Sequence, residues 1–139
     1  MTIGKRSKRQ VEIARERIYE RDSHRCIVFG QSASLVWPCN GGITIQHSVA
    51  RGMGGSAQFD GPEYLRTMCS FHNTLDTANA TFRAECLKNG WSIPRWLAIS
   101  EGVRNVPVSY ADGWFLLDGF DRVPLTDEQA ENLREDLGI

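Results

Sequence analysis

The feature that most constrains the fold of this chain is a set of four metal-ligating side chains divided between two segments. Cys26 and Cys39 belong to the first segment, and the second reads Cys69-Ser-Phe-His72. A two-residue gap between Cys and His is typical of a zinc knuckle, in which backbone amides turn toward a thiolate. Thiolates and an imidazole suit a tetrahedral zinc ion, so the sequence predicts a structural Zn²⁺ site that joins two loops.

The alternative is that Cys26 and Cys39 are ordinary buried thiols, as free cysteines often are. A second cysteine would be expected near Phe29, which cannot ligate, so Cys39 has to come from the end of an inserted loop. Disulfides are a poor explanation in a reducing compartment. The fourth cysteine, Cys86, falls on an apolar helix face and is expected in the core.

Length and composition allow one hydrophobic core, because the chain has 139 residues of which 41% are hydrophobic. No segment approaches the ~20 apolar residues that a membrane span needs. The Lys- and Arg-rich N-terminus is not followed by the apolar run of a signal peptide. We therefore expect a soluble, cytoplasmic protein without a membrane partner.

The net charge of −1 conceals a gradient along the chain. Residues 1–25 contain eight Lys or Arg and four Asp or Glu, whereas residues 101–139 contain three and nine. A basic arm suits contact with DNA phosphates, and an acidic tail suits a basic protein partner. The alternative for both is a solvated surface. The residues of the arm expected to contact DNA are Lys5, Arg6, Lys8 and Arg9.

The apolar pattern predicts an α+β fold without a linker that would split it. Three parts are expected: a basic arm and helix over 1–20, a core over 21–99, and an acidic hairpin-and-helix extension of the same domain over 100–139.

Turn and capping signals divide these parts into elements. The pattern predicts helices over 7–21 and 73–89, a strand at 43–45, an irregular loop over 51–61, a short helical turn within 62–68, Gly90 as a C-cap, a hairpin over 106–117, and a last helix opened by the capping box of Thr126 and Gln129.

A second polar group surrounds His47, which follows the β-branched run Ile43-Thr-Ile45. The glycine-rich segment Arg51-Gly-Met-Gly-Gly55 comes shortly after it. An imidazole can act as a general base, and oxygen ligands near it can hold a divalent metal. The alternative is a structural histidine near a strand end.

Candidate ligands for that metal are Gln46, Asn73 and Asp76. Carboxamides alone would hold Mg²⁺ weakly, because they bring no charge. Asp76 lies three residues after Asn73 and shares its helix face. The alternative for Asp76 is a first-turn acid that stabilises the helix N-terminus. Arg51 or Arg66 would hold a phosphate.

From Arg21 to about Trp96 the chain resembles small HNH endonucleases encoded by actinobacterial phages. The resemblance is carried by Arg21-Asp-Ser-His-Arg-Cys26, Gln46-His47-x4-Arg-Gly-Met-Gly-Gly, His72-Asn73 and Gly90-Trp-Ser-Ile-Pro-Arg95. It implies a ββα-metal core with a zinc knuckle, DNA as substrate, and the cytoplasm of an infected host as location.

The same resemblance places His47 at the catalytic histidine of the family and shows where this chain departs from it. Gln46 stands where Asp or His is usual, Tyr64 falls near the central Asn, and Asn73 falls on the last His. The motif is therefore a degenerate, HNN-like one.

Three functions follow from these observations. The first and favoured one is a DNA endonuclease that uses Mg²⁺ or Mn²⁺ to hydrolyse phosphodiester bonds by nicking or loosely specific cleavage. The second is a catalytically degenerate phage regulator that binds DNA or protein. The third is a zinc-stabilised structural or host-interaction protein without a nucleic-acid role.

Overall fold

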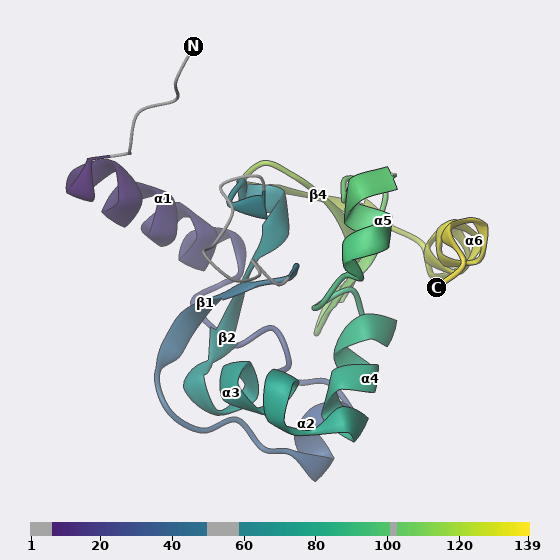
Figure 1. The fold of residues 1–139 in the computed structure, drawn as a ribbon, viewed down its shortest axis with the longest axis horizontal. Helices are drawn as coiled ribbons and strands as arrows, with labels where there is room; N and C mark the ends of the chain where they lie inside the picture. The colour runs from purple at the N-terminus through teal and green to yellow at the C-terminus, as the bar shows by residue number, and fades with distance from the viewer. Residues whose placement is uncertain (1–6, 50–58, 101–102) are drawn as a thin grey trace.

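The computed structural model describes residues 7–49, 59–100 and 103–139. In this part of the chain the fold is mixed α+β, with six α-helices and two small antiparallel sheets (Figure 1). The expectations for residues 1–6 and most of those for the glycine-rich loop fall outside the described residues.

The first helix, α1 (Lys8–Arg21), confirms the prediction for this segment. Ser7 caps it, and the side chains of Ser7 and Gln10 bond reciprocally to each other's backbone amide as a capping box. At its other end the Arg21 guanidinium donates to the carbonyls of Pro62 at 2.8 Å and Leu65 at 2.6 Å. These bonds fix α1 to the strand that begins at Leu65.

The two-stranded sheet pairs β1 (Ile43–His47) with β2 (Leu65–Cys69) in antiparallel register, with His47 opposite Leu65 and Ile43 opposite Cys69. The strand at 43–45 was predicted. The helical turn expected within 62–68 is limited to the 3-10 helix η2 (Pro62–Tyr64), and the remainder is strand because it pairs with β1.

Helix α3 (Ser70–Ala78) follows β2 without a connecting loop. Gly41, shortly before β1, lies against Ser70, the first residue of α3. Its φ is +82°, and a Cβ at this position would collide with the Ser70 hydroxyl. The chain therefore turns from strand into helix beside the start of β1.

The single helix predicted over 73–89 is wrong, because α3 ends at Ala78 and α4 (Ala80–Lys88) begins after Asn79. Asn79 has an extended backbone, and its side chain accepts a hydrogen bond from the Phe82 amide at 2.9 Å. Asparagine competes well for such a cap, which outweighs the continuous apolar pattern. Gly90, predicted at the end of this region, has the expected positive φ of +73°.

The C-terminal sheet is a three-stranded meander of β3 (Val108–Tyr110), β4 (Gly113–Asp118) and β5 (Asp121–Leu125). The predicted hairpin corresponds to β3 and β4, whereas β5 was not predicted. Helix α6 (Asp127–Leu137) begins with the predicted capping box of Thr126 and Gln129. Two shorter helices, α2 (Ala33–Val36) and α5 (Arg95–Ser100), complete the described elements.

Two buried hydrophobic clusters hold these elements together. The first joins the segment around Val28 to Phe82, Trp91 and the β3–β4 hairpin, and it includes Cys86 as predicted. The second joins Phe59, α5 and the loop before β3. The Trp91 indole donates to the Ser109 carbonyl at 2.8 Å, so the C-terminal sheet packs directly on the end of α4.

Candidate functional site

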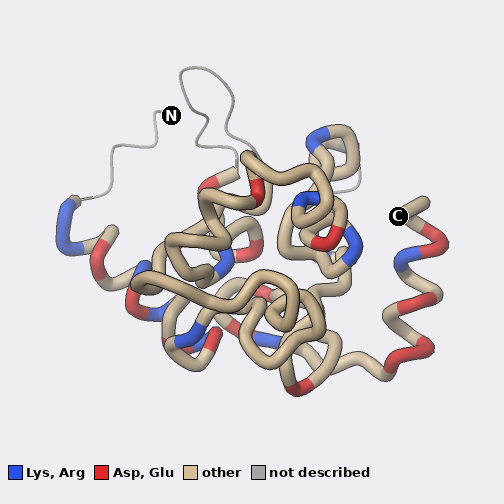
Figure 2. The backbone as a smooth tube through the Cα atoms, turned by 90° about the horizontal axis from the view of Figure 1, so that it is seen from below, with Lys and Arg blue, Asp and Glu red and all other residues tan. Residues whose placement is uncertain are grey.

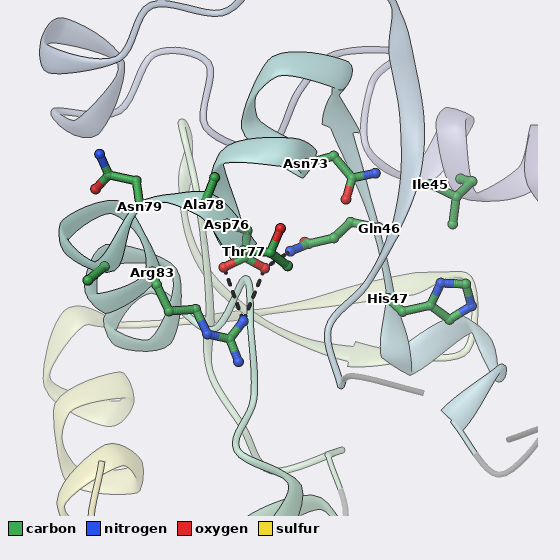
Figure 3. A pocket seen from close by; sticks show the side chains of 10 residues that line it. Ile45, Gln46, His47, Asn73, Asp76, Thr77, Ala78, Asn79 and Arg83 are labelled. Atoms are coloured by element: carbon green, nitrogen blue, oxygen red, sulfur yellow. Dashed lines mark hydrogen bonds and ion pairs between the residues drawn. The ribbon is translucent and has the colours of Figure 1, made fainter. Parts of the chain in front are cut away.

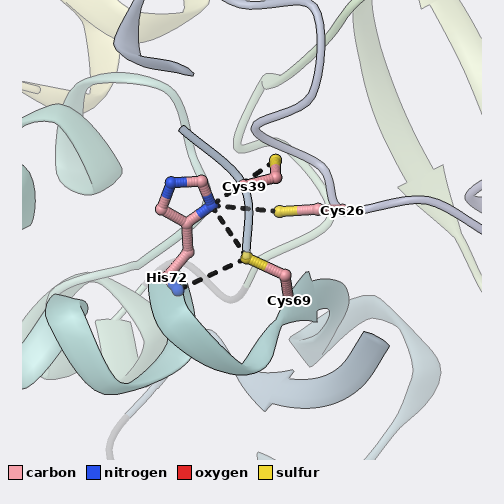
Figure 4. A group of neighbouring side chains, drawn as sticks. All are labelled: Cys26, Cys39, Cys69 and His72. Atoms are coloured by element: carbon pink, nitrogen blue, oxygen red, sulfur yellow. Dashed lines mark hydrogen bonds between the residues drawn. The ribbon is translucent and has the colours of Figure 1, made fainter. Parts of the chain in front are cut away.

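The four predicted zinc ligands converge (Figure 4). The ligand atoms of Cys26, Cys39, Cys69 and His72 all lie within 4.8 Å of one another. His72 Nδ1 is 3.3, 3.8 and 3.2 Å from the Sγ atoms of Cys26, Cys39 and Cys69. Zn–S and Zn–N bonds of about 2.3 and 2.0 Å at tetrahedral angles separate sulfur from nitrogen by about 3.5 Å. The spacing therefore fits a tetrahedral metal ion.

The surroundings of His72 orient it for metal binding through Nδ1. Its Nε2 lies 2.6 Å from the Trp37 carbonyl, so Nε2 carries the proton and Nδ1 presents a lone pair to the cluster. The ring stacks on Phe82 with centroids 5.0 Å apart. The His72 amide donates to Cys69 Sγ at 3.5 Å, which is the amide-to-sulfur contact predicted for a knuckle.

The electrostatics of the cluster require a cation if the sulfurs are to be thiolates. Burial raises the pKa of the Cys26 thiol, and repulsion from the other two sulfurs adds to this effect. Burial also raises the pKa of Cys39, with further repulsion from Cys69. A bound divalent ion would offset both the burial and the repulsion between the sulfurs, because its charge stabilises the thiolates that ligate it. The donor set suits structural Zn²⁺.

A second site lies beside α3, where an open cleft of about 780 Å³ reaches from β1 to α4. It contains all four residues predicted for catalysis: Gln46, His47, Asn73 and Asp76. Figure 3 shows that Gln46 extends toward Asp76, whereas His47 points to the other side of β1. This alternation is expected for neighbouring residues of a strand.

Asp76 is the centre of a buried hydrogen-bond network. Its Oδ2 accepts from Gln46 Nε2 at 2.6 Å and from Ser92 Oγ at 2.8 Å. Arg83 Nη1 lies 3.0 Å from Oδ1 and 3.1 Å from Oδ2. The carboxylate therefore already has a cation beside it. Sequence reasoning missed Arg83, because Asp76 lies on α3 and Arg83 on α4, so their spacing of seven residues does not place them on one helix face.

The alternative interpretation of Asp76 as a first-turn acid is wrong. Helix α3 starts at Ser70 and has no acidic residue in its first turn, so Asp76 lies in the second half of the helix. Its charge is balanced by Arg83 rather than by the helix N-terminus. Gln46, which is only 3% exposed, gives its Nε2 to Asp76 and leaves its Oε1 buried without a donor among the described residues.

His47 has a partner that was not predicted. Its Nε2 lies 3.2 Å from Asp60 Oδ1, and both side chains are partly exposed. The pair lies at the end of β1, on the side where Figure 3 shows His47 turned away from Asp76. Asp60 follows the glycine-rich segment and precedes a Gly-Pro turn, so no periodic pattern connects it with His47.

Asn73 contacts β1 through its side chain, since Nδ2 donates to Thr44 Oγ1 at 2.9 Å. This bond leaves the amide oxygen of Asn73 available to the cleft that the residue lines.

Of the two predicted phosphate-binding arginines, the structure describes Arg66. Arg66 is fully buried, and its guanidinium donates to the carbonyls of Gly90, Glu63 and Leu65. Arg66 is therefore not accessible to a phosphate in this structure, because its side chain is buried and its guanidinium is hydrogen-bonded to the backbone. Arg51 lies outside the described residues.

Charge is distributed unevenly over the described chain (Figure 2). Lys8 and Arg9 are exposed at the start of α1, and Lys5 and Arg6 precede the described residues. Helix α6 carries five acidic residues and one arginine, and it packs through Ala130 with its acidic residues largely exposed. No described helix has the length and apolar character needed to cross a membrane.

Comparisons of the chain with protein-family models, with curated proteins and with solved structures give no match. The functional interpretation consequently depends on the residues and geometry of the two sites.

Proposed function

We propose that this chain is a metal-dependent, HNH-type endonuclease that hydrolyses phosphodiester bonds in DNA. The observation that carries the proposal is a structural unit beside one cleft, in which β1 pairs with β2 and α3 follows β2 directly. Asn73 and Asp76 on α3 line that cleft, and His47 lies at its edge at the end of β1, with its ring turned away from Asp76. The Cys3His cluster at the start of α3 would hold a structural zinc ion that fixes this unit.

In the proposed reaction His47 is the general base. His47 Nε2 lies 3.2 Å from Asp60 Oδ1, and Nδ1 can accept a proton from a water molecule when the ring proton is on Nε2. That water then attacks phosphorus, and the bond from phosphorus to the leaving oxygen breaks. DNA is too large to enter a closed pocket, so a general base that acts on it has to be accessible at the surface. The partial exposure of His47 meets this requirement.

The residues that would hold a catalytic Mg²⁺ or Mn²⁺ are Asp76, Asn73 and Gln46. The buried Oε1 of Gln46 lacks a donor among the described residues, and an acceptor of this kind fits a nearby cation. Such an ion, when bound, stabilises the negative charge that develops on the phosphoryl group. Its binding to Asp76 requires Arg83 to release that carboxylate.

The Asp76–Arg83 pair favours a second candidate function, a catalytically degenerate DNA- or protein-binding regulator. Asp76 is the only acidic residue among the described residues that line the cleft, and the arginine beside it supplies the charge that a metal would otherwise bring. Lys8 and Arg9 would contact DNA under either function. The acidic face of α6 as a docking surface, a phage origin and a cytoplasmic location remain proposals.

The test is a plasmid-nicking assay on zinc-loaded protein with Mg²⁺, with Mn²⁺, and without either metal. We expect metal-dependent nicking that His47→Ala abolishes. The matched control is His24→Ala, because His24 is a second exposed histidine paired with a carboxylate, at 3.0 Å from Glu16 on α1. Absence of cutting in every metal, with salt-sensitive DNA binding retained, would establish the regulator instead.

A further inference from the structure

We propose that Arg83 binds a backbone phosphate of the nucleic acid in the cleft between β1 and α4. This inference rests on the proposed function only for the class of ligand, which the endonuclease and the DNA-binding regulator share. It assigns to Arg83 the role that was predicted for Arg66, whose guanidinium is buried among backbone carbonyls.

Arg83 places a positive charge in the lining of the cleft. Of the described residues that line the cleft, Arg83 alone is a lysine or arginine, and its side chain is 37% exposed. The other lining side chains are neutral or small apart from His47 and Asp76. A phosphate that enters this cleft therefore meets Arg83 as its strongest electrostatic partner.

The guanidinium is held in a geometry that leaves its phosphate-binding edge available. Nη1 bonds to both oxygens of Asp76, and among the described residues Nε and Nη2 have no partner. Figure 3 shows the second amino group directed away from Asp76. An arginine donates to phosphate through two parallel N–H bonds, and Nε with Nη2 forms such a fork.

The anchor of Arg83 is itself fixed. Asp76 is 6% exposed, and Gln46 and Ser92 both donate to its Oδ2. A side chain held in this way loses less conformational entropy on binding than a free surface arginine does. The network thus orients Arg83 before any ligand arrives.

The position of Arg83 on its helix adds to the argument. It is the fourth residue of α4, near the N-terminus, where the helix dipole disfavours a cation and favours an anion. Asn79 and Ala80, at that same N-terminus, also line the cleft. The field of the helix and the charge of Arg83 therefore act on a bound phosphate in the same direction.

The competing explanation is that Arg83 serves only as the counter-ion of buried Asp76. Removal of Arg83 alone cannot separate the two, because it leaves a buried carboxylate unpaired and destabilises the fold. Asp76→Asn removes that charge first. The informative comparison is then Asp76→Asn with the double variant Asp76→Asn/Arg83→Gln, which differ only in Arg83.

The experiment measures binding of both variants to two unrelated DNA duplexes by fluorescence anisotropy over a series of salt concentrations. The protein is the full chain loaded with zinc, without added Mg²⁺ or Mn²⁺, so that no cutting interferes. Each phosphate contact contributes about 0.9 to the slope of log K against log salt. We expect the double variant to have a slope smaller by about this amount, equally for both duplexes.

Lys88→Gln is the control, because it removes one positive charge from the exposed end of the same helix and does not line the cleft. Its slope should equal that of the unaltered chain. Arg83→Lys gives a second measurement in a chain that keeps the charge pair. We expect it to retain the slope and to bind several-fold more weakly, because lysine cannot form the fork.

Equal slopes for the Asp76→Asn protein and the double variant would overturn the inference, whether or not the chain cuts DNA. A smaller slope without any nicking by the unaltered chain would support the inference and reject the endonuclease. Nicking together with equal slopes would retain the endonuclease and reject the role of Arg83. Absence of DNA binding by the unaltered chain would reject both.

Discussion

His47 Nε2 lies 3.2 Å from Asp60 Oδ1, and the two side chains are exposed to a similar extent, 32% and 34%. A carboxylate at this distance favours a proton on Nε2 through its charge, although the contact does not have the geometry of a hydrogen bond. Nδ1 is then the nitrogen that can accept a proton. Asp60 would therefore act on the reaction through His47 rather than by touching the substrate.

The first prediction concerns this pair. Asp60→Asn should lower the rate constant for nicking by roughly tenfold while leaving DNA affinity unchanged, because it removes the charge that favours a proton on His47 Nε2. His47→Ala should remove the general base altogether, at a cost of about 10²–10⁴-fold. Single-turnover nicking and DNA-binding measurements separate these quantities.

Glu16→Gln provides the control for Asp60→Asn, since Glu16 pairs with His24 in an exposed contact of the same type. We expect it to leave both rate and affinity unaltered. Loss of DNA binding in the Asp60→Asn protein, with an unchanged rate at saturation, would contradict the positioning role.

The second prediction concerns the Cys3His cluster. The purified chain should contain one zinc ion, and its removal by a chelator should lower the melting temperature or unfold the chain, because binding energy at a structural zinc site is folding energy. Cys39→Ser should weaken zinc binding with little direct effect on packing, since Cys39 is the exposed member of the cluster.

Cys86→Ala is the matched control, because Cys86 is a buried cysteine outside the cluster. It should retain one zinc ion and lose only the ~1–3 kcal/mol typical of a small change in a packed core. Native mass spectrometry and thermal unfolding with and without added zinc measure both effects. A full zinc content in the Cys39→Ser protein, with unchanged affinity, would contradict the four-ligand site.

The convergence of Cys26, Cys39, Cys69 and His72 was predictable because metal ligation restricts the residue types and their local spacing. The same holds for the capping box of Thr126 and Gln129 and for Gly90, whose signals lie within a few residues. The division between α3 and α4 was missed because the apolar pattern has the same helical spacing before and after Asn79, where the helix ends. In that case a local hydrogen bond outweighed periodicity.

The partners of the candidate catalytic residues could not be predicted in the same way. Asp60 contacts His47 although the two are far apart in the sequence, and Ser92 reaches Asp76 from beyond α4. Such contacts depend on tertiary packing rather than on a repeat along the chain. Arg66 shows the converse, since its charge suggested an exposed phosphate contact and the fold uses it for backbone hydrogen bonds.

The third prediction concerns Arg66. Its guanidinium donates to the carbonyls of Gly90, Glu63 and Leu65, and burial lowers its pKa to about 10. Arg66→Lys should destabilise the fold by about 1–3 kcal/mol, because an ammonium group cannot reach all three buried acceptors. Urea unfolding measures this change.

DNA binding distinguishes this structural role from the phosphate contact that the sequence suggested. At temperatures where the Arg66→Lys protein is folded, its slope of log K against log salt should equal that of the unaltered chain. A slope smaller by about 0.9 would mean that Arg66 contacts a phosphate after all.

The fourth prediction concerns the pH dependence of stability through Asp22. Burial opposes ionisation of this carboxylate, but hydrogen bonds and charge from Arg21, with further bonds from Tyr110 and the Thr67 amide, leave the pKa of Asp22 below its usual 3.8. A carboxylate whose folded pKa is lowered stabilises the fold above the unfolded value. That contribution is lost as the pH falls through the folded pKa.

Asp22→Asn should therefore lower the free energy of unfolding most above about pH 4, and the difference from the unaltered chain should shrink as the pH falls below 3.8. Urea unfolding of both proteins between pH 7 and about 2.5 measures it. Zinc release at low pH affects the two proteins alike, so their difference isolates Asp22. Asp136→Asn is the control, since Asp136 is exposed on α6 and takes part in no ion pair among the described residues. A difference for Asp22→Asn that stays constant over this pH range would mean that its ionisation does not stabilise the fold.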